Sequence, residues 1–241
     1  MSFRRVLLAV PFLLLAQACT NVSSQENAYR HLPPTPPELR NPHLRALIAE
    51  YDRYFADTMA QARVPGAAVV IVHDSTVIFQ RGYGLRHIGK PDSVDAHTVF
   101  RIGSLSKGFA GVLTGMLVQE DALHWDDRIV RYVPEFALSS PKNTAQVQIT
   151  HLLAHTTGLP YHAYTNLIEA GYDLRTIAAK FSKLPLNGAP GKVFTYQNAA
   201  FALVGEAMQA ATGKTYAELL AQKIFGPAGM RTASADWESM Q

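Results

Sequence analysis

The distribution of strands constrains the fold most, because only two strand-like runs are evident, at residues 67–73 and 77–83. Both runs are rich in β-branched or aromatic residues, and the turn-like residues 74–76 join them, so they predict a hairpin. A two-stranded sheet is marginal without packing partners. Residues 44–62 carry apolar side chains at helical spacing, so we expect this helix to pack on the hairpin.

After Tyr83 the sequence changes to helices and loops. Apolar spacing and capping residues predict helices at residues 104–119, 148–155, 174–181, 198–211 and 215–225. None of these segments offers the hairpin a further strand, and residues 237–241 bring no terminal structural element. We therefore expect the sequence to be a C-terminally truncated fragment.

The composition indicates a globular protein, since 48% of the 241 residues are hydrophobic and 17% are charged. The formal net charge is +3, and Arg4 and Arg5 supply two of these charges in a segment that we expect to be removed. Because no basic stripe interleaved with aromatic residues is evident, we expect no nucleic-acid partner.

Residues 1–18 have the pattern of a signal peptide, with two arginines, an apolar run and a small-x-small cleavage site. The apolar run, residues 6–15, is too short to predict a membrane-spanning helix. We therefore expect an exported protein, periplasmic or in the cell envelope.

Cys19 is the only cysteine and directly follows the cleavage site, which excludes an intramolecular disulfide. It is either an incidental first residue or the lipidated residue of a bacterial lipoprotein, and we expect lipidation. The flanking residues depart from the usual lipobox at Ala16 and Gln17. Residues 19–43 are polar and proline-rich beyond Cys19, which suits an anchor and linker before a folded domain at residues 44–241.

Residues 100–120 carry the main functional signal, in which Ser104 and Lys107 stand at the start of a long apolar helix. Side chains three residues apart lie on one helix face and reach each other. At the helix start, unpaired N–H groups and the helix dipole favour developing negative charge. Ser104 is therefore a candidate nucleophile, with Lys107 as its base.

Serine three residues before lysine is a weak signal alone, and the chain repeats it at Ser139 and Lys142. That second copy contains Pro141, is predicted to lie in a loop and has no apolar helix behind it. We interpret it as a chance match.

His151 and His155 are four residues apart, a spacing that also occurs in zinc sites, but no third ligand is evident. Hydrogen bonding at the end of a helix is the simpler interpretation. We expect neither a metal nor an organic cofactor.

Tyr196 and Asn198 form a second candidate constellation just before the helix at residues 198–211. From that position both side chains can project into a cleft, where Tyr196 could relay protons if a nearby lysine lowers its pKa. Asn198 could orient a substrate amide and hydrogen-bond Lys107. The alternative is an asparagine that caps the helix beside a buried tyrosine.

The chain resembles the class C β-lactamase family, which includes related D-Ala-D-Ala carboxypeptidases and serine esterases. The resemblance extends from about Val64 to Met230 and rests on the segments VPGAAVVIVHD, FRIGSLSKGFAGVLTGMLVQEDAL, ITHLLAHTTGLP and FTYQNAAFALVGEAMQAATGKTYAELLAQKIFGPAGM. It implies an α+β fold, in which an antiparallel sheet with flanking helices meets a mainly helical region at the site.

The resemblance also implies roles for four residues. Ser104 would be the nucleophile, Lys107 the base, Tyr196 the catalytic tyrosine and Asn198 the substrate-orienting amide. The expected reaction is acyl transfer from a β-lactam, a D-Ala-D-Ala peptide or a small ester, and the sequence does not choose among these substrates.

The family's third motif, a Lys/His-Thr/Ser-Gly strand, is missing from this sequence. The HTTG letters at His155 resemble that motif but stand between predicted helices. In the family this strand supplies one of two oxyanion N–H groups, and losing one such donor costs about 10²–10³ in rate. The alternatives are therefore a penicillin- or peptidoglycan-binding protein without turnover, or an inactive fragment.

Overall fold

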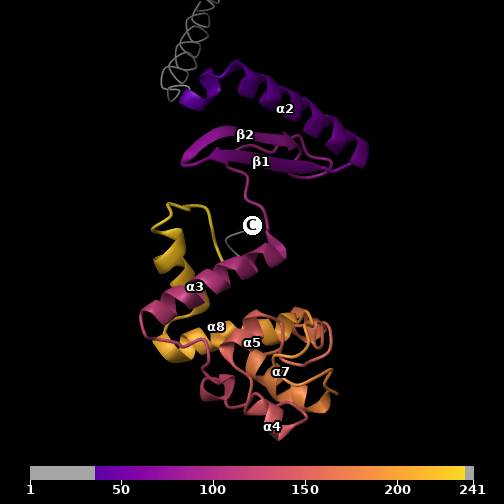
Figure 1. Ribbon diagram of the computed structural model, residues 1–241. Helices are drawn as coiled ribbons and strands as arrows, with labels where there is room; N and C mark the ends of the chain where they lie inside the picture. Colours follow the sequence, from indigo (N-terminus) through magenta and orange to yellow (C-terminus); the bar gives the residue numbers. More distant parts are fainter. Residues whose placement is uncertain (1–35, 237–241) are drawn as a thin grey trace, which may run out of the picture. The chain divides into compact units, whose positions relative to one another are not determined.

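The computed structural model describes residues 36–236 (Figure 1). These residues belong to two compact units, one ending at Thr98 and the other beginning at Val99. The predicted signal peptide, Cys19 and most of the linker lie outside the described residues, so these domain assignments stay predictions. Within residues 36–236, no helix combines the length and apolar character that crossing a membrane requires.

The first unit is a hairpin with one long helix. Helix α2 (Pro42–Ala62) follows the 3₁₀ turn η1 (Pro37–Arg40) and precedes strands β1 (Gly66–His73) and β2 (Thr76–Gly84). The strands pair in antiparallel fashion, which confirms the predicted hairpin.

Aromatic side chains pack α2 on the hairpin. The rings of Tyr51 and Phe79 lie 6.1 Å apart, and those of Phe55 and Tyr83 lie 4.9 Å apart. The Tyr83 hydroxyl also donates a hydrogen bond of 2.6 Å to the Asp52 carboxylate of α2. Burial, together with this carboxylate, raises the pKa of Tyr83 to about 12, so the phenol stays a donor at neutral pH.

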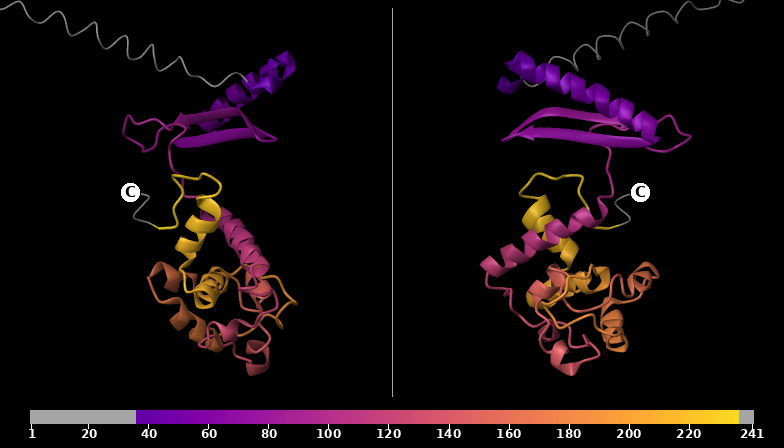
Figure 2. Two further views of the ribbon diagram at one scale, coloured as in Figure 1. Left: turned by 90° about the vertical axis from the view of Figure 1, so that its left-hand side faces the viewer. Right: turned by 45° about the vertical axis from the view of Figure 1, so that its right-hand side comes forward.

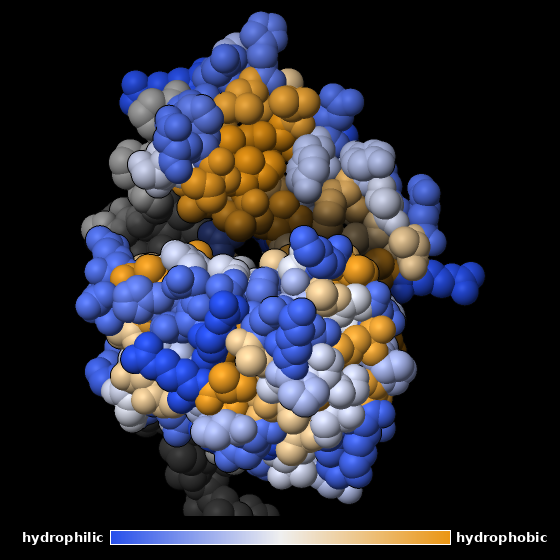
Figure 3. Space-filling model, turned by 60° about the horizontal axis from the view of Figure 1, so that its bottom comes forward, coloured by the Kyte–Doolittle hydropathy of each residue, from blue (hydrophilic) through white to orange (hydrophobic). Residues whose placement is uncertain are grey.

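Some valines of the sheet are exposed within residues 36–236. Val70, Val72 and Val77 are exposed on β1 and β2, and apolar side chains gather in the orange area in the upper part of Figure 3. Within residues 36–236 the sheet has two strands, which agrees with the sequence prediction.

The second unit is helical. Its elements are η2 (Gly103–Ser106), α3 (Lys107–Gln119), η3 (Ile129–Arg131), α4 (Pro141–Thr144), α5 (Ile149–Leu153), α6 (Thr165–Glu169), α7 (Leu174–Lys180), η4 (Phe181–Lys183), α8 (Asn198–Thr212), α9 (Tyr216–Leu220) and the π-helical turn η5 (Ala221–Phe225).

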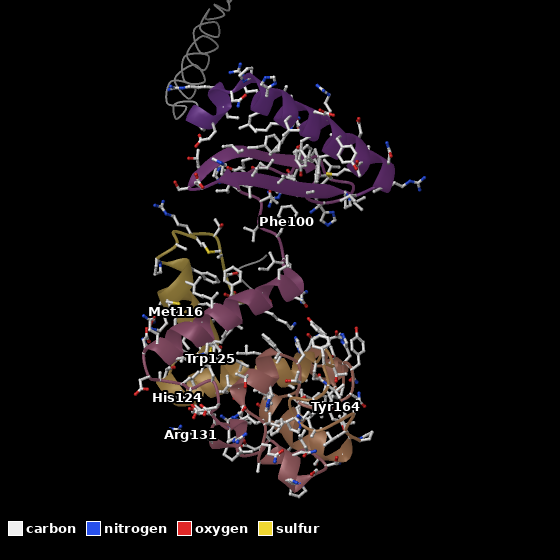
Figure 4. All side chains as sticks on the ribbon, viewed as in Figure 1. Phe100, Met116, His124, Trp125, Arg131 and Tyr164 are labelled. Carbon is white, nitrogen blue, oxygen red and sulfur yellow. The ribbon has the colours of Figure 1, made fainter. Side chains whose placement is uncertain are left out.

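Helix α8 is central to this unit, because α3, α5, α6, α7 and α9 all contact it (Figures 1 and 2). Its inner face is fully or almost fully buried and consists of Ala199, Ala200, Leu203, Val204, Ala207 and Met208. Burying a leucine-sized side chain contributes about 1.5–3 kcal/mol. Aromatic rings complete the core: the ring centroids of Phe181 and Phe136 lie 6.1 Å apart, and those of Phe181 and Tyr164 lie 6.0 Å apart. Tyr164 is labelled in Figure 4. Asn198 is the first residue of this well-packed helix.

Three local predictions need correction. Ser104 does not begin an α-helix but lies in the 3₁₀ turn η2, directly before α3. The segment predicted as a loop around Pro141 is the short helix α4, because Ser140 caps it and proline suits a first helical turn. The helix predicted at residues 215–225 is α only in its first part, and its second half is the π-helical turn.

Candidate active site

The turn that carries Ser104 depends on Gly103. This glycine has a φ of 53°, a left-handed conformation that glycine adopts without steric cost. Its carbonyl accepts a hydrogen bond of 2.6 Å from the Ser106 hydroxyl, which closes the turn. Ser104 is left exposed at the N-terminal end of α3, where a nucleophile is accessible to substrate.

Lys107 links the turn to α8. Its Nζ donates a hydrogen bond of 3.3 Å to Ser104 Oγ and one of 2.8 Å to Asn198 Oδ1. The spacing of three residues thus places the amine beside the hydroxyl, as the sequence predicted.

Tyr196 joins the same cluster from the loop before α8. Its hydroxyl donates a hydrogen bond of 2.7 Å to Ser104 Oγ, and Lys107 Nζ lies 4.8 Å from its ring centroid. The interaction with Lys107, followed by that with Ser104, lowers the pKa of the Tyr196 phenol, because both favour the phenolate. An ionised Tyr196 could accept the proton of Ser104 across this contact.

The structure therefore brings the four predicted side chains together. The alternative, in which Asn198 caps the helix, is wrong, because the cap of α8 is Gln197, whose side chain accepts from the Ala199 N–H. Asn198 is free to bind Lys107, and the rest of its amide has no other partner within the described residues. Cys19, the predicted lipidation site, lies outside the described residues.

Sequence reasoning missed a buried polar layer behind this cluster. His155 is 8% exposed and Gln197 is 1% exposed. The Gln197 side chain donates a hydrogen bond of 2.9 Å to the Pro160 carbonyl, while its backbone N–H donates one of 3.2 Å to His155 Nδ1. The His155 ring stacks on Phe201 at 5.3 Å, and Lys107 Nζ lies 5.2 Å from the same Phe201 ring. In the sequence, the HTTG segment that begins at His155 was the feature that could have indicated this layer.

The Nδ1 atoms of His151 and His155, whose spacing also occurs in zinc sites, both accept hydrogen bonds from backbone N–H groups. No group of three possible metal ligands occurs in the described part of the chain. His151 Nδ1 instead accepts a hydrogen bond from the Gln148 N–H at 3.1 Å, as expected at a helix end.

The glycine of HTTG serves a close backbone approach. Gly158 has a φ of 90°, and a Cβ at this position would lie 2.3 Å from the Gly188 carbonyl oxygen. Its own carbonyl accepts a hydrogen bond of 2.8 Å from the Asn187 N–H. Gly158 thus holds together two loops of the helical unit. This structural role accounts for the HTTG sequence, which is not the family's third motif.

A cavity of about 510 Å³ adjoins Lys107 and Asn198. Its volume lies within the range of about 300–1,000 Å³ that small-molecule sites occupy. The remaining lining residues come from η2, α3, α6, α7, α8 and α9: Ser106, Ala110, Thr165, Ile168, Glu169, Leu174, Phe201, Ala202, Val204, Gly205, Glu206, Gln209 and Tyr216. Small residues of α3 and α8 leave this space open.

Residues 51–239 match the family model described as Beta-lactamase. Unguisins hydrolase ungD of Aspergillus violaceofuscus is 26% identical over 192 residues, which cover 76% of this chain and 34% of that protein. Protein flp of Staphylococcus aureus is 25% identical over 187 residues, covering 77% of this chain and 38% of that protein. The chain thus spans between a third and two-fifths of these relatives.

A solved structure shows the same fold. The octameric penicillin-binding protein homologue from Pyrococcus abyssi matches with a TM-score of 0.67 and 27% identity, over 76% of this chain and 43% of that one. The predicted α+β fold of the β-lactamase/transpeptidase type is therefore confirmed.

Proposed function

Because the chain belongs to the beta-lactamase family, we propose that it is a serine hydrolase that forms an acyl-enzyme at Ser104. The contact of Ser104 Oγ with both Tyr196 and Lys107 carries this proposal, since it places a nucleophile beside two groups able to take its proton. Asn198 supports it, because Lys107 holds this amide beside the nucleophile.

The proposed reaction has two steps. Ser104 Oγ attacks the carbonyl carbon while its proton passes to the Tyr196–Lys107 pair, and the resulting tetrahedral intermediate expels an amine or alcohol that takes this proton. Water then attacks the acyl-enzyme and gives one proton to the same pair. When the acid is released, this proton passes from the pair to Ser104 Oγ. The lowered pKa of Tyr196 supports this role, because a base is most effective when its pKa approaches the working pH. The chemistry needs no metal or organic cofactor.

The proposed substrate is an amide or ester: a β-lactam, a D-Ala-D-Ala peptide or a small ester. The names of the relatives, a hydrolase and a penicillin-binding protein homologue, support this range. A chromogenic cephalosporin, a D-Ala-D-Ala peptide and a p-nitrophenyl ester, each incubated with the full-length protein, test it. Hydrolysis of at least one is expected. Turnover of none, with labelling by fluorescent penicillin, would favour the alternative of a penicillin-binding protein without turnover.

The cavity beside Lys107 is proposed to receive the acyl group. Ala202→Leu adds bulk to the lining, so we expect kcat/KM for a p-nitrophenyl octanoate to fall about tenfold while that for the acetate changes little. Ala210→Leu, on an exposed position of α8 outside the lining, is the matched control. Equal effects of Ala202→Leu on both esters would place the acyl group elsewhere.

We also propose that the protein is exported and anchored to the cell envelope through a lipid on Cys19. The signal-peptide pattern of residues 1–18 and the place of the lone cysteine directly after it support this. Metabolic labelling with a radioactive fatty acid is expected to mark the wild type and not Cys19→Ser. An unlabelled mature wild-type protein would rule lipidation out.

A further inference from the structure

The loop that carries Tyr196 is fixed on both sides by one residue. The backbone carbonyl of His155 accepts a hydrogen bond of 2.8 Å from the Thr195 N–H. The ring atom Nδ1 of His155 accepts a hydrogen bond of 3.2 Å from the Gln197 N–H. The two residues that flank Tyr196 in sequence are therefore bound to the same buried histidine.

The His155 ring also contacts the side chains that surround the amine of Lys107. Its centroid lies 4.4 Å from that of Tyr196 and 5.3 Å from that of Phe201. Lys107 Nζ lies 4.8 Å and 5.2 Å from these same two rings. A displacement of the imidazole would therefore disturb both partners of Ser104.

We infer that His155 is a positioning residue of the acylation site, which in its neutral form holds Tyr196 against Ser104 and releases it when protonated. The inference rests on the proposed acyl transfer at Ser104. It goes further in assigning a function to a histidine that touches neither the nucleophile nor the reacting atoms.

The protonation state decides this function. Nδ1 can accept from Gln197 only while it carries no proton, so the ring is neutral with its proton on Nε2. A second proton would place an N–H opposite the Gln197 N–H and a positive charge near Lys107. Of the titratable groups in the described residues, Lys107 of α3 and Tyr196 lie beside this ring. Burial, followed by the charge of Lys107, lowers the pKa of His155, which keeps the ring neutral at pH 7.

The backbone conformation of His155 suggests a substitution that keeps the hydrogen bond to the Gln197 N–H but removes the group that takes up a proton. Its φ is 56°, a left-handed conformation that asparagine tolerates better than most residues. An asparagine side chain can also present Oδ1 to the Gln197 N–H, and it does not titrate. His155→Asn should therefore keep the hydrogen bond and lose the pH sensitivity, whereas His155→Phe keeps a ring and loses the acceptor.

His162 offers a matched control. It has a similar φ of 54°, and its ring lies 5.4 Å from that of Tyr196. Its Nδ1 faces the Thr165 hydroxyl at 3.5 Å rather than the backbone beside Tyr196. His162→Asn thus makes the same substitution at a comparable backbone position, without changing an acceptor of the Tyr196 loop.

The test measures the rate constant for labelling of Ser104 by a fluorophosphonate between about pH 4 and 9. This range extends well below the ordinary histidine pKa of about 6.5, because the pKa of His155 is lowered. In this reaction Ser104 Oγ bonds to phosphorus, fluoride leaves, and the serine proton passes to the Tyr196–Lys107 pair. Below the pKa of this pair, the pair must first release one proton, so the logarithm of the rate there falls with slope one on acidification. In the wild type and His162→Asn this slope is expected to approach two once His155 also protonates, below about pH 6.5.

His155→Asn is expected to keep slope one to the acid end of the range and to match the wild type at neutral pH. His155→Phe is expected to lose about tenfold or more in rate at neutral pH, because it leaves the Gln197 N–H unpaired. A steepening that persists in His155→Asn overturns the inference, as does wild-type labelling of a folded His155→Phe. If the phenylalanine variant does not fold, the asparagine variant decides. Absence of labelling in the wild type would overturn the proposed function itself.

Discussion

Ser104→Ala is expected to lower kcat/KM by about 10⁴-fold or more on any substrate that the protein hydrolyses, because it removes the nucleophile. The cluster of Lys107, Tyr196 and Asn198 would remain, but without an oxygen to which the acyl group can bond. Initial rates of the wild type and Ser104→Ala on one chromogenic substrate measure the effect, after thermal unfolding has shown that both proteins are equally stable.

The second serine–lysine pair provides the control for this variant. Ser139 is exposed and lies just before α4, far along the chain from the cluster. Ser139→Ala should therefore leave kcat/KM unchanged. If Ser104→Ala retained wild-type turnover, the assignment of the nucleophile would be wrong.

Lys107→Met is expected to reduce kcat/KM by about 10²–10⁴-fold, the usual effect of losing a general base. Methionine keeps most of the length and the apolar character of the stem but removes the donor to Ser104 and to Asn198. Because Lys107 is the first cause of the lowered pKa of Tyr196, its loss should raise that pKa. Tyr196 would then ionise only at higher pH, so any residual activity should rise at higher pH than in the wild type.

Lys142→Met in the second pair is the matched control and should behave as the wild type, since Lys142 is exposed on α4. The double variant Ser104→Ala/Lys107→Met should be no slower than Ser104→Ala, because residues that act as one unit have non-additive effects. A pH profile of Lys107→Met that coincides with that of the wild type would contradict the role of Lys107.

The sequence predicted the four side chains of the cluster because their relations are short-range. Ser104 and Lys107 are joined by helical spacing, and Tyr196 and Asn198 stand two residues apart before a well-capped helix. The long helices and the hairpin were predictable for the same reason, since apolar periodicity and turn residues report local conformation. The residue types suggested that Asn198 could bind Lys107, the family resemblance implied a common site, and the structure shows the Lys107–Asn198 hydrogen bond.

The features that escaped prediction depend on contacts between distant residues or on very short elements. Helices α4 and α6 span four and five residues, too few to show a period. The buried layer of His155 and Gln197 joins residues 42 positions apart, and neither residue is apolar. Polar residues in a core leave no periodic pattern in the sequence, so their burial is visible only in the structure.

The most direct test of Ser104 as the nucleophile is the intact mass of the full-length protein after incubation with a fluorophosphonate, followed by peptide mapping. One adduct is expected, on the peptide that contains Ser104, and Ser104→Ala should show none. An unmodified wild-type protein, or an adduct on Ser139 or Ser106 that persists in Ser104→Ala, would contradict it.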